Sequence, residues 1–145
     1  MAADTYAAPV EDVAKPARWT LWVGRVLSAL PVLMLLFSAF IKVAHKPETV
    51  GMFTGKFGYP EGTLGPLAVV EAGCAVLFAI PATATLGAVL VTGYLGGAVA
   101  THVRVGDPFL IPVLLGAFAW AGLWLRDDRL RTLLPLRRRI APRGR

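Results

Sequence analysis

The sequence predicts an all-α protein, a four-helix transmembrane bundle with its N-terminus and C-terminus both in the cytoplasm. Hydrophobic residues make up 56% of the 145 residues, and the mean hydropathy is +0.62. Both values are high for a soluble domain. The apolar residues fall into four long segments, while the basic residues gather towards the two ends of the chain. The segments predict four crossings, and the basic residues predict which side the ends occupy.

The first crossing is expected at about residues 19–43. Before it, residues 1–17 carry Ala, Pro and charges without an apolar stripe, so we expect a flexible cytoplasmic tail. Trp19 and Trp22 suit the aromatic belt at a membrane interface. Pro31 lies inside the segment and predicts a kink, which membrane helices tolerate.

Residues 45–62 form the outer loop of the predicted bundle, since Gly and Pro are frequent there. This loop also carries four large apolar or aromatic side chains, namely Met52, Phe53, Phe57 and Tyr59. Such side chains are poorly placed in free solution. We therefore expect an ordered, amphipathic segment that lies over the outer mouth of the bundle at the membrane surface.

The next apolar stretch is too long for one crossing, which needs roughly 20 residues. Pro81 marks the natural break, so crossings are expected at about 64–80 and 83–101. The second of these is rich in small residues, and Gly93 and Gly97 form a GxxxG pattern. Small residues let helix backbones approach closely, so this pattern favours tight packing within the bundle.

The fourth crossing is expected at about 109–125, which closes a membrane domain of residues 18–126. Residues 127–145 then form a basic cytoplasmic tail. Beside a membrane, anionic lipid is the expected partner of such a tail, and no nucleic-acid partner is expected.

Four crossings place both chain ends on one side of the membrane. That side holds most of the bases, namely Lys15, Arg18 and eight arginines from Arg126 to Arg145. The opposite loops hold only Lys46, Lys56 and Arg104. Because the more basic side normally faces the cytoplasm, both termini are predicted to be cytoplasmic.

These chain directions place the polar side chains Lys42, Glu71, His102 and Arg104 in the outer half of the membrane. Glu71 lies roughly 10 Å below the surface at a helical rise of about 1.5 Å per residue. Tyr94 can share a helix face with His102. Ionisable groups in the bilayer are costly and by default functional. Two interpretations remain open: an outward-opening polar site, or a buried ion pair of Glu71 with Lys42 or Arg104.

No metal site is expected. His102 has no second His or Cys at a ligand spacing, and His45 fits an interfacial loop residue. The only cysteine, Cys74, excludes an internal disulfide and a CxxC redox pair. No phosphate-binding loop, nucleophile–base pair or haem-ligand pair emerges.

The chain resembles the DoxX-like family of small bacterial membrane proteins. The resemblance rests on the runs RWTLWVGRVLSALPVLMLLFSAFIK, GYPEG and VEAGCAVLFAIPATATLGAVLVTGYLGGAVATHVRVGDP, followed by a Trp-containing helix and LRDDRL. It covers Arg18 to about Leu136. The residues that match recurring polar positions of the family are Lys42, Glu71, Thr101 and His102. Many relatives carry an acid a few positions before the lysine, where this chain has Ser38-Ala39-Phe40-Ile41.

The family is similar to DoxX and DoxD proteins, which are associated with quinone-linked sulfur oxidation and membrane redox complexes. The resemblance therefore implies a multi-pass protein of the bacterial cytoplasmic (inner) membrane that interacts with quinone as a redox subunit. Residues expected to carry the chemistry are Glu71, His102 and Lys42. Residues expected to contact substrate are Tyr94, Thr101 and Arg104. The chain has no redox-cofactor motif, so electrons would come from a partner subunit or a soluble donor.

A second class of function stays open beside the first. A non-catalytic assembly subunit, or a binder of a lipophilic small molecule, fits the glycine-rich helix and the apolar loop equally well. Its partners would be other membrane redox subunits or further copies of the chain. A transporter is less well supported, because the sequence shows no inverted repeat.

Overall fold

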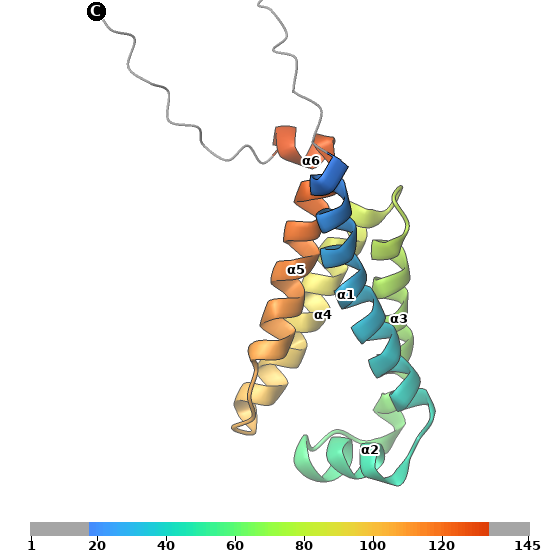
Figure 1. Cartoon of the computed structure of the whole chain (residues 1–145). Coiled ribbons are helices and arrows are strands. Elements are labelled where there is room, and N and C mark those ends of the chain that lie inside the picture. The colour runs from blue at the N-terminus through green and yellow to red at the C-terminus, as the bar shows by residue number, and fades with distance from the viewer. Residues whose placement is uncertain (1–17, 134–145) are drawn as a thin grey trace, which may run out of the picture.

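The structure, a computed structural model, describes residues 18–133, which form helices and connecting turns without a β-strand (Figure 1). The helices are α1 (Arg18–Val43), α2 (Pro47–Gly51), the π-helix η1 (Met52–Lys56), the 3₁₀-helix η2 (Glu61–Thr63), α3 (Leu64–Ala79), α4 (Ala84–Arg104), α5 (Leu110–Arg126) and α6 (Asp128–Leu133). The all-α prediction is confirmed. The predictions for residues 1–17 and for 134–145 lie outside the described residues.

Within residues 18–133, three helical segments are long and apolar enough to cross a membrane. They are α1 (Arg18–Val43), η2 together with α3 (Glu61–Ala79), and α4 (Ala84–Arg104). Helix α5 is also apolar but has 17 residues, fewer than these three. Helix α4 ends three residues later than the predicted 101, so His102 lies in the last turn of the helix rather than in the turn that follows it. Residues 128–133, expected as tail, form the short helix α6.

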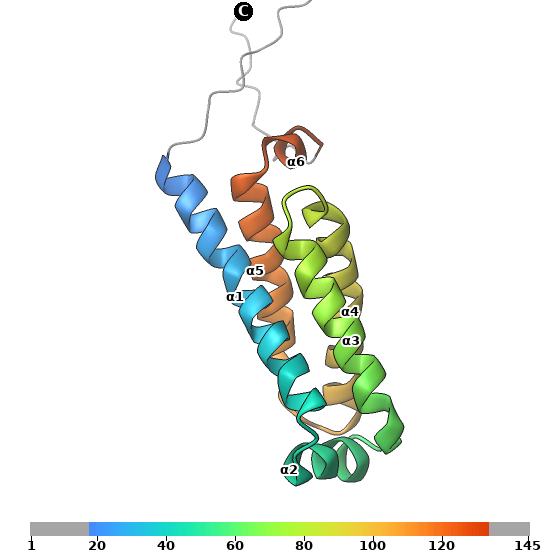
Figure 2. The ribbon, with the colours of Figure 1, turned by 90° about the vertical axis from the view of Figure 1, so that its right-hand side faces the viewer.

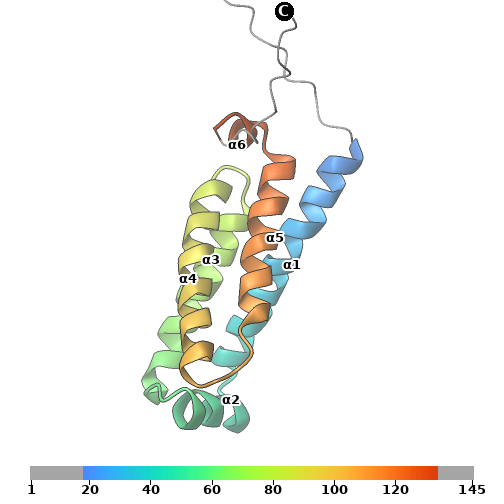
Figure 3. The ribbon, with the colours of Figure 1, turned by 90° about the vertical axis from the view of Figure 1, so that its left-hand side faces the viewer.

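The four long helices lie side by side, and each packs against two others (Figures 2 and 3). Helix α1 contacts α3 and α5, while α4 contacts the same two helices from the other side. The segment of α2 and η1 covers one end of this group, and α6 lies at the other end (Figure 1). Both ends of the described chain are at the α6 end.

Packing is tightest at the α6 end, where glycines let backbones meet. A Cβ atom on Gly87 of α4 would lie 2.2 Å from the backbone nitrogen of Phe78 on α3. A Cβ atom on Gly122 of α5 would lie 2.6 Å from Ser28 Oγ on α1. Such distances leave room only for hydrogen, so these glycines set the spacing of the helices.

The predicted role of Gly93 and Gly97 in close packing is wrong. A Cβ atom on either residue would have nothing within 4 Å. Both glycines face a cavity instead, because the helices have moved apart at this level of α4. Gly87, two turns earlier on the same helix, makes the close contact.

Towards the α2 end, α4 and α5 diverge from α1 and α3 (Figure 1). The wedge-shaped space between the diverging helices is crossed by α2, η1 and η2, which come from the predicted loop of residues 45–62. Two of the four large side chains of this loop, Phe53 and Phe57, are buried with Leu64 in a separate apolar cluster. Met52, by contrast, is 43% exposed. The ring of Tyr59 packs against the same cluster. We call residues 47–63 the strap, because they bridge the open end of the wedge.

Candidate functional site

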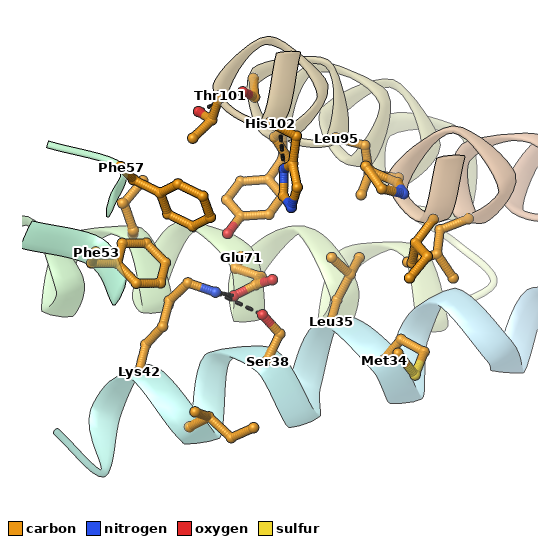
Figure 4. Close-up of a pocket in the computed structure, with 18 of the residues that line it drawn as sticks. Met34, Leu35, Ser38, Lys42, Phe53, Phe57, Glu71, Leu95, Thr101 and His102 are labelled. Carbon is orange, nitrogen blue, oxygen red and sulfur yellow. Dashed lines mark hydrogen bonds and ion pairs between the residues drawn. The ribbon is translucent and has the colours of Figure 1, made fainter. Parts of the chain in front are cut away.

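A cavity of about 560 Å³ lies in the wedge between the four long helices and the strap (Figure 4). Most of its lining is apolar. The polar lining residues are Ser38, Lys42, Thr49, Tyr59, Glu71, Tyr94, Thr101, His102 and Asp107. An apolar cavity with a few converging polar groups is the usual form of a small-molecule site.

A buried ion pair forms one wall of the cavity. Lys42 Nζ on α1 lies 2.8 Å from Glu71 Oε2 on α3, and the two side chains are only 8% and 3% exposed. Lys42 also donates a hydrogen bond of 2.6 Å to Ser38 Oγ (Figure 4). Buried charges need such partners, because an unpaired charge away from water is strongly destabilising. The pair therefore allows both charges to remain buried between the helices.

Local helix geometry explains this arrangement. Ser38 and Lys42 are four residues apart, so both side chains occupy one face of α1. The ammonium group of Lys42 also lies 5.4 Å from the centre of the Phe53 ring in the strap. The Ser38 hydroxyl accepts a hydrogen bond from the lysine without adding a charge. The i, i+4 spacing was the signal that could have identified Ser38 as a partner.

Tyr94 of α4 lines the same cavity as the ion pair, and its phenol group lies close enough to the Glu71 carboxylate for the two groups to interact electrostatically. The cavity wall around Glu71 therefore carries polar side chains from α1 and from α4.

His102 faces the cavity from α4, on the side opposite Lys42 (Figure 4). Its Nδ1 lies 2.8 Å from the carbonyl oxygen of Ala98. A carbonyl oxygen can only accept, so Nδ1 carries the hydrogen in this bond, and Nε2 is the ring nitrogen without a hydrogen-bond partner in the described part of the chain. The Phe57 ring, 5.4 Å from the imidazole, covers it on the strap side.

Thr101 joins α4 to the strap. Its Oγ1 donates to the carbonyl oxygen of Gly97 at 2.9 Å, which uses the single hydroxyl hydrogen. The Tyr59 hydroxyl, 2.6 Å away, is therefore the donor in the bond between the two side chains. Sequence reasoning named Tyr59 only as an apolar loop residue and missed this bond.

Arg104 does not line the cavity. Its guanidinium donates to the carbonyl oxygen of Phe57 and lies 5.7 Å from the Tyr59 ring. The ion pair between Lys56 and Asp107, 2.7 Å long, adds another link between the strap and the turn after α4. Arg104 therefore helps to close the wedge, whereas the sequence assigned it to substrate binding.

Of the six residues that the sequence singled out, five line one cavity: Lys42, Glu71, Tyr94, Thr101 and His102. Between the two partners proposed for Glu71, the structure selects Lys42. Among residues 18–133, no three His, Cys, Asp or Glu side chains group as metal ligands. Cys74 is buried in the core, away from the cavity lining.

Apolar helices of membrane-spanning length, with a paired charge buried between them, define a multi-pass integral membrane protein. Residues 26–122 match the DoxX-like family, which is more than half of the 145 residues. The chain belongs to the DoxX-like family, and the resemblance seen in the sequence is confirmed. No curated protein and no solved structure matches the chain.

Proposed function

We propose that this protein binds a quinone-type molecule within the bacterial cytoplasmic membrane, as a subunit of a membrane redox system. The observation that carries the proposal is the cavity of about 560 Å³, in which apolar walls meet the ion pair of Lys42 and Glu71. A quinone also combines a polar part with an apolar part, since it has a polar headgroup and a hydrocarbon chain.

The membrane arrangement that we propose is a four-helix transmembrane bundle with both termini cytoplasmic. Helix α5 provides the fourth crossing, since its 17 residues span about 26 Å at a rise of about 1.5 Å per residue. Both ends of the described chain lie at the α6 end (Figure 1). The concentration of bases beyond these ends supports a cytoplasmic position for that side. The strap and the cavity then belong to the outer half.

The polar wall offers what a quinone headgroup requires. Its carbonyl oxygens need hydrogen-bond donors, and Lys42 keeps one of its three N–H groups after bonding to Glu71 and Ser38. Nε2 of His102, when it carries no proton, can accept one from the hydroxyl of the reduced quinone. Glu71, which pairs with Lys42 in the same wall of the cavity, would relay protons. Electrons would come from a partner subunit or a soluble donor.

The surroundings of the cavity favour a ligand that arrives from the lipid. The strap covers the end of the wedge, whereas several apolar lining residues on α1 and α5 remain open to the outside. Met34 is 45%, Phe37 59% and Ile111 62% exposed. A molecule dissolved in the bilayer can reach the cavity past these side chains without crossing water.

Mass spectrometry of the protein purified with native lipid tests the proposal. Wild type is expected to carry quinone. Ala98→Phe, which places a large ring at a half-buried position in the cavity lining, is expected to lose it. Ala100→Phe is the matched control, since Ala100 is exposed on the same helix and does not line the cavity. Equal quinone content in all three proteins would contradict the site.

One observation favours the second candidate, a non-catalytic assembly subunit or a binder of another lipophilic molecule. Glu71 already has a full partner in Lys42, so its charge is explained without chemistry. Native-lipid purification separates the candidates. A bound lipophilic molecule other than quinone, displaced by Ala98→Phe, supports the binder. Co-purifying subunits without any bound small molecule support the assembly role.

A further inference from the structure

A second cavity, of about 400 Å³, lies at the α6 end of the molecule, away from the cavity described above. Its apolar lining consists of Leu21, Pro81, Ala84 and Leu123, and its charged lining of Arg25, Arg126, Asp127, Asp128 and Arg129. The residues come from α1, the turn between α3 and α4, the first residue of α4, α5 and the start of α6. The cavity therefore lies where several helix ends meet.

Three arginines line this cavity, and two of them, Arg25 of α1 and Arg126 of α5, repel each other. Within residues 18–133, Arg25 makes no hydrogen bond or ion pair, and its guanidinium lies 5.5 Å from the Trp22 ring. Tryptophan at a helix end is typical of the interface between lipid headgroups and hydrocarbon. Arg25 therefore lies beside a residue type that is common at headgroup level, and its guanidinium donors have no hydrogen-bond partner within residues 18–133.

Arg126 is also short of partners. A guanidinium has five N–H donors. In the described part of the chain, Arg126 makes one hydrogen bond, of 3.3 Å, to the carbonyl oxygen of Phe78, and its Nε is buried without a partner. A buried donor without an acceptor is unfavourable, so an added acceptor at this position would stabilise the fold.

Asp127 attracts Arg126, but both carboxylates in the lining are already engaged. Asp127 Oδ1 accepts from the backbone N–H groups of Arg129 and Leu130 at 2.9 and 3.4 Å, and so caps α6. Asp128 Oδ1 lies 3.6 Å from a guanidinium nitrogen of Arg131. Neither carboxylate forms an ion pair within 4.0 Å with Arg25 or Arg126 in the described residues, so both cations remain available to an anion.

We propose that this second cavity binds the phosphate of an anionic phospholipid, with Arg25 and Arg126 as the residues that hold it. Arginine pairs with phosphate oxygens through two parallel N–H groups, and basic pockets between membrane helices are suited to lipid headgroups. The apolar residues Leu21 and Leu123 line the same cavity and can contact the glycerol and the first acyl carbons. Phosphates lie at both membrane faces, so the site does not depend on which face is cytoplasmic.

Native mass spectrometry and thermal unfolding of the full chain in detergent test the site, with phosphatidylglycerol added and phosphatidylcholine as the neutral lipid. A ligand that binds only the folded state raises the unfolding temperature. We expect phosphatidylglycerol adducts and a higher unfolding temperature for wild type, and neither effect with phosphatidylcholine. Arg25→Gln and Arg126→Gln should lose both effects.

Arg18→Gln is the matched control, because Arg18 is exposed at the same end of α1 and does not line the cavity. It removes the same charge as Arg25→Gln, so general attraction to anionic lipid falls equally in both. Loss of phosphatidylglycerol binding to the same extent in Arg18→Gln and Arg25→Gln would overturn the proposal. If Arg126→Gln does not fold, Arg25→Gln decides, since its side chain is exposed.

Inorganic phosphate tests whether the second cavity binds the phosphate of a phospholipid or free phosphate from solution. A phospholipid site predicts no rise in unfolding temperature with inorganic phosphate alone. A rise equal to that with phosphatidylglycerol, abolished by Arg25→Gln, would show a site for soluble phosphate and overturn the lipid assignment. Ala98→Phe should retain phosphatidylglycerol, which keeps this site separate from the quinone cavity.

Discussion

The two ends of the helix group differ in what holds them together. At the α6 end, backbones meet at Gly87 and Gly122, and the core around Phe78 is fully buried. At the α2 end, the helices diverge, and a buried ion pair, aromatic rings and the strap occupy the space. Close backbone packing at the α6 end holds the four helices together, so that they can diverge at the α2 end and leave a cavity there. The close helix contacts of the α6 end, which we call the closed end, set the helix positions. The diverging α2 end, which we call the open end, holds the larger of the two cavities described above.

The ion pair of the open end should give the largest effect of any single change. Glu71→Gln leaves the ammonium of Lys42 buried without an anion, and we expect a loss of about 3–5 kcal/mol of unfolding free energy. Glu71→Gln/Lys42→Met removes both charges and should recover much of this loss. Ser38→Ala, which removes only one hydrogen bond, should cost about 0.5–1.5 kcal/mol. Thermal unfolding in detergent measures all three.

The Glu71→Gln and Glu71→Gln/Lys42→Met variants also distinguish a structural role of Glu71 from a catalytic one. Full stability of Glu71→Gln, together with complete loss of quinone-dependent turnover, would contradict a structural ion pair and support a catalytic Glu71. Lost stability that the double variant restores would support the structural role.

The closed end is tested by adding one methyl group to its tightest contact. Gly87→Ala places a Cβ atom 2.2 Å from the backbone nitrogen of Phe78, so α3 and α4 must separate. We expect a loss of about 1–3 kcal/mol or more, as in overpacked cores. Gly96→Ala on the same helix meets nothing within 4 Å and should leave stability nearly unchanged. Similar melting of the two variants in nanodiscs would show that close packing does not hold this end.

Breaking the hydrogen bond between the strap and α4 should lower stability by less than loss of the buried ion pair or overpacking of the closed end. Tyr59→Phe removes the hydrogen bond to Thr101, worth about 0.5–1.5 kcal/mol. Amide exchange over residues 47–63 should therefore accelerate, with little change at the α6 end. Thr54→Val is the control, because the Thr54 hydroxyl bonds only to Val50 within the strap. The link has no role in closing the wedge if Tyr59→Phe exchanges as slowly as wild type.

The exposed ion pair of the strap should give the smallest effect. The side chains of Lys56 and Asp107 are 52% and 21% exposed, and such pairs contribute about 0–1 kcal/mol. Lys56→Gln should slightly accelerate strap exchange at low salt and make no difference at high salt, because salt screens exposed charges. Lys46→Gln, an exposed lysine without an ion pair in the described residues, should have no effect at either salt concentration. An effect of Lys56→Gln that persists at high salt would contradict a screened surface pair.

The sequence by itself determined the helical class and the half of the molecule in which each polar residue lies. Long apolar segments must be helical in a bilayer, because every backbone polar group needs an internal partner there. Helical rise then converts residue number into depth, so Lys42, Glu71 and His102 could be assigned to one end. The resemblance to the family also followed from local runs such as GYPEG and GGAVATH, which lie within residues 26–122, the part of the chain that matches the family.

Only the tertiary structure decided which of these residues meet. A sequence gives the depth of a side chain, but the rotation and tilt of each helix follow from packing against its neighbours. That rotation selected Lys42 for Glu71 and turned Arg104 towards the strap. Divergence of the helices left Gly93 and Gly97 facing a cavity while Gly87 made the close contact. These outcomes depend on contacts between distant segments, which residue spacing within one helix does not record.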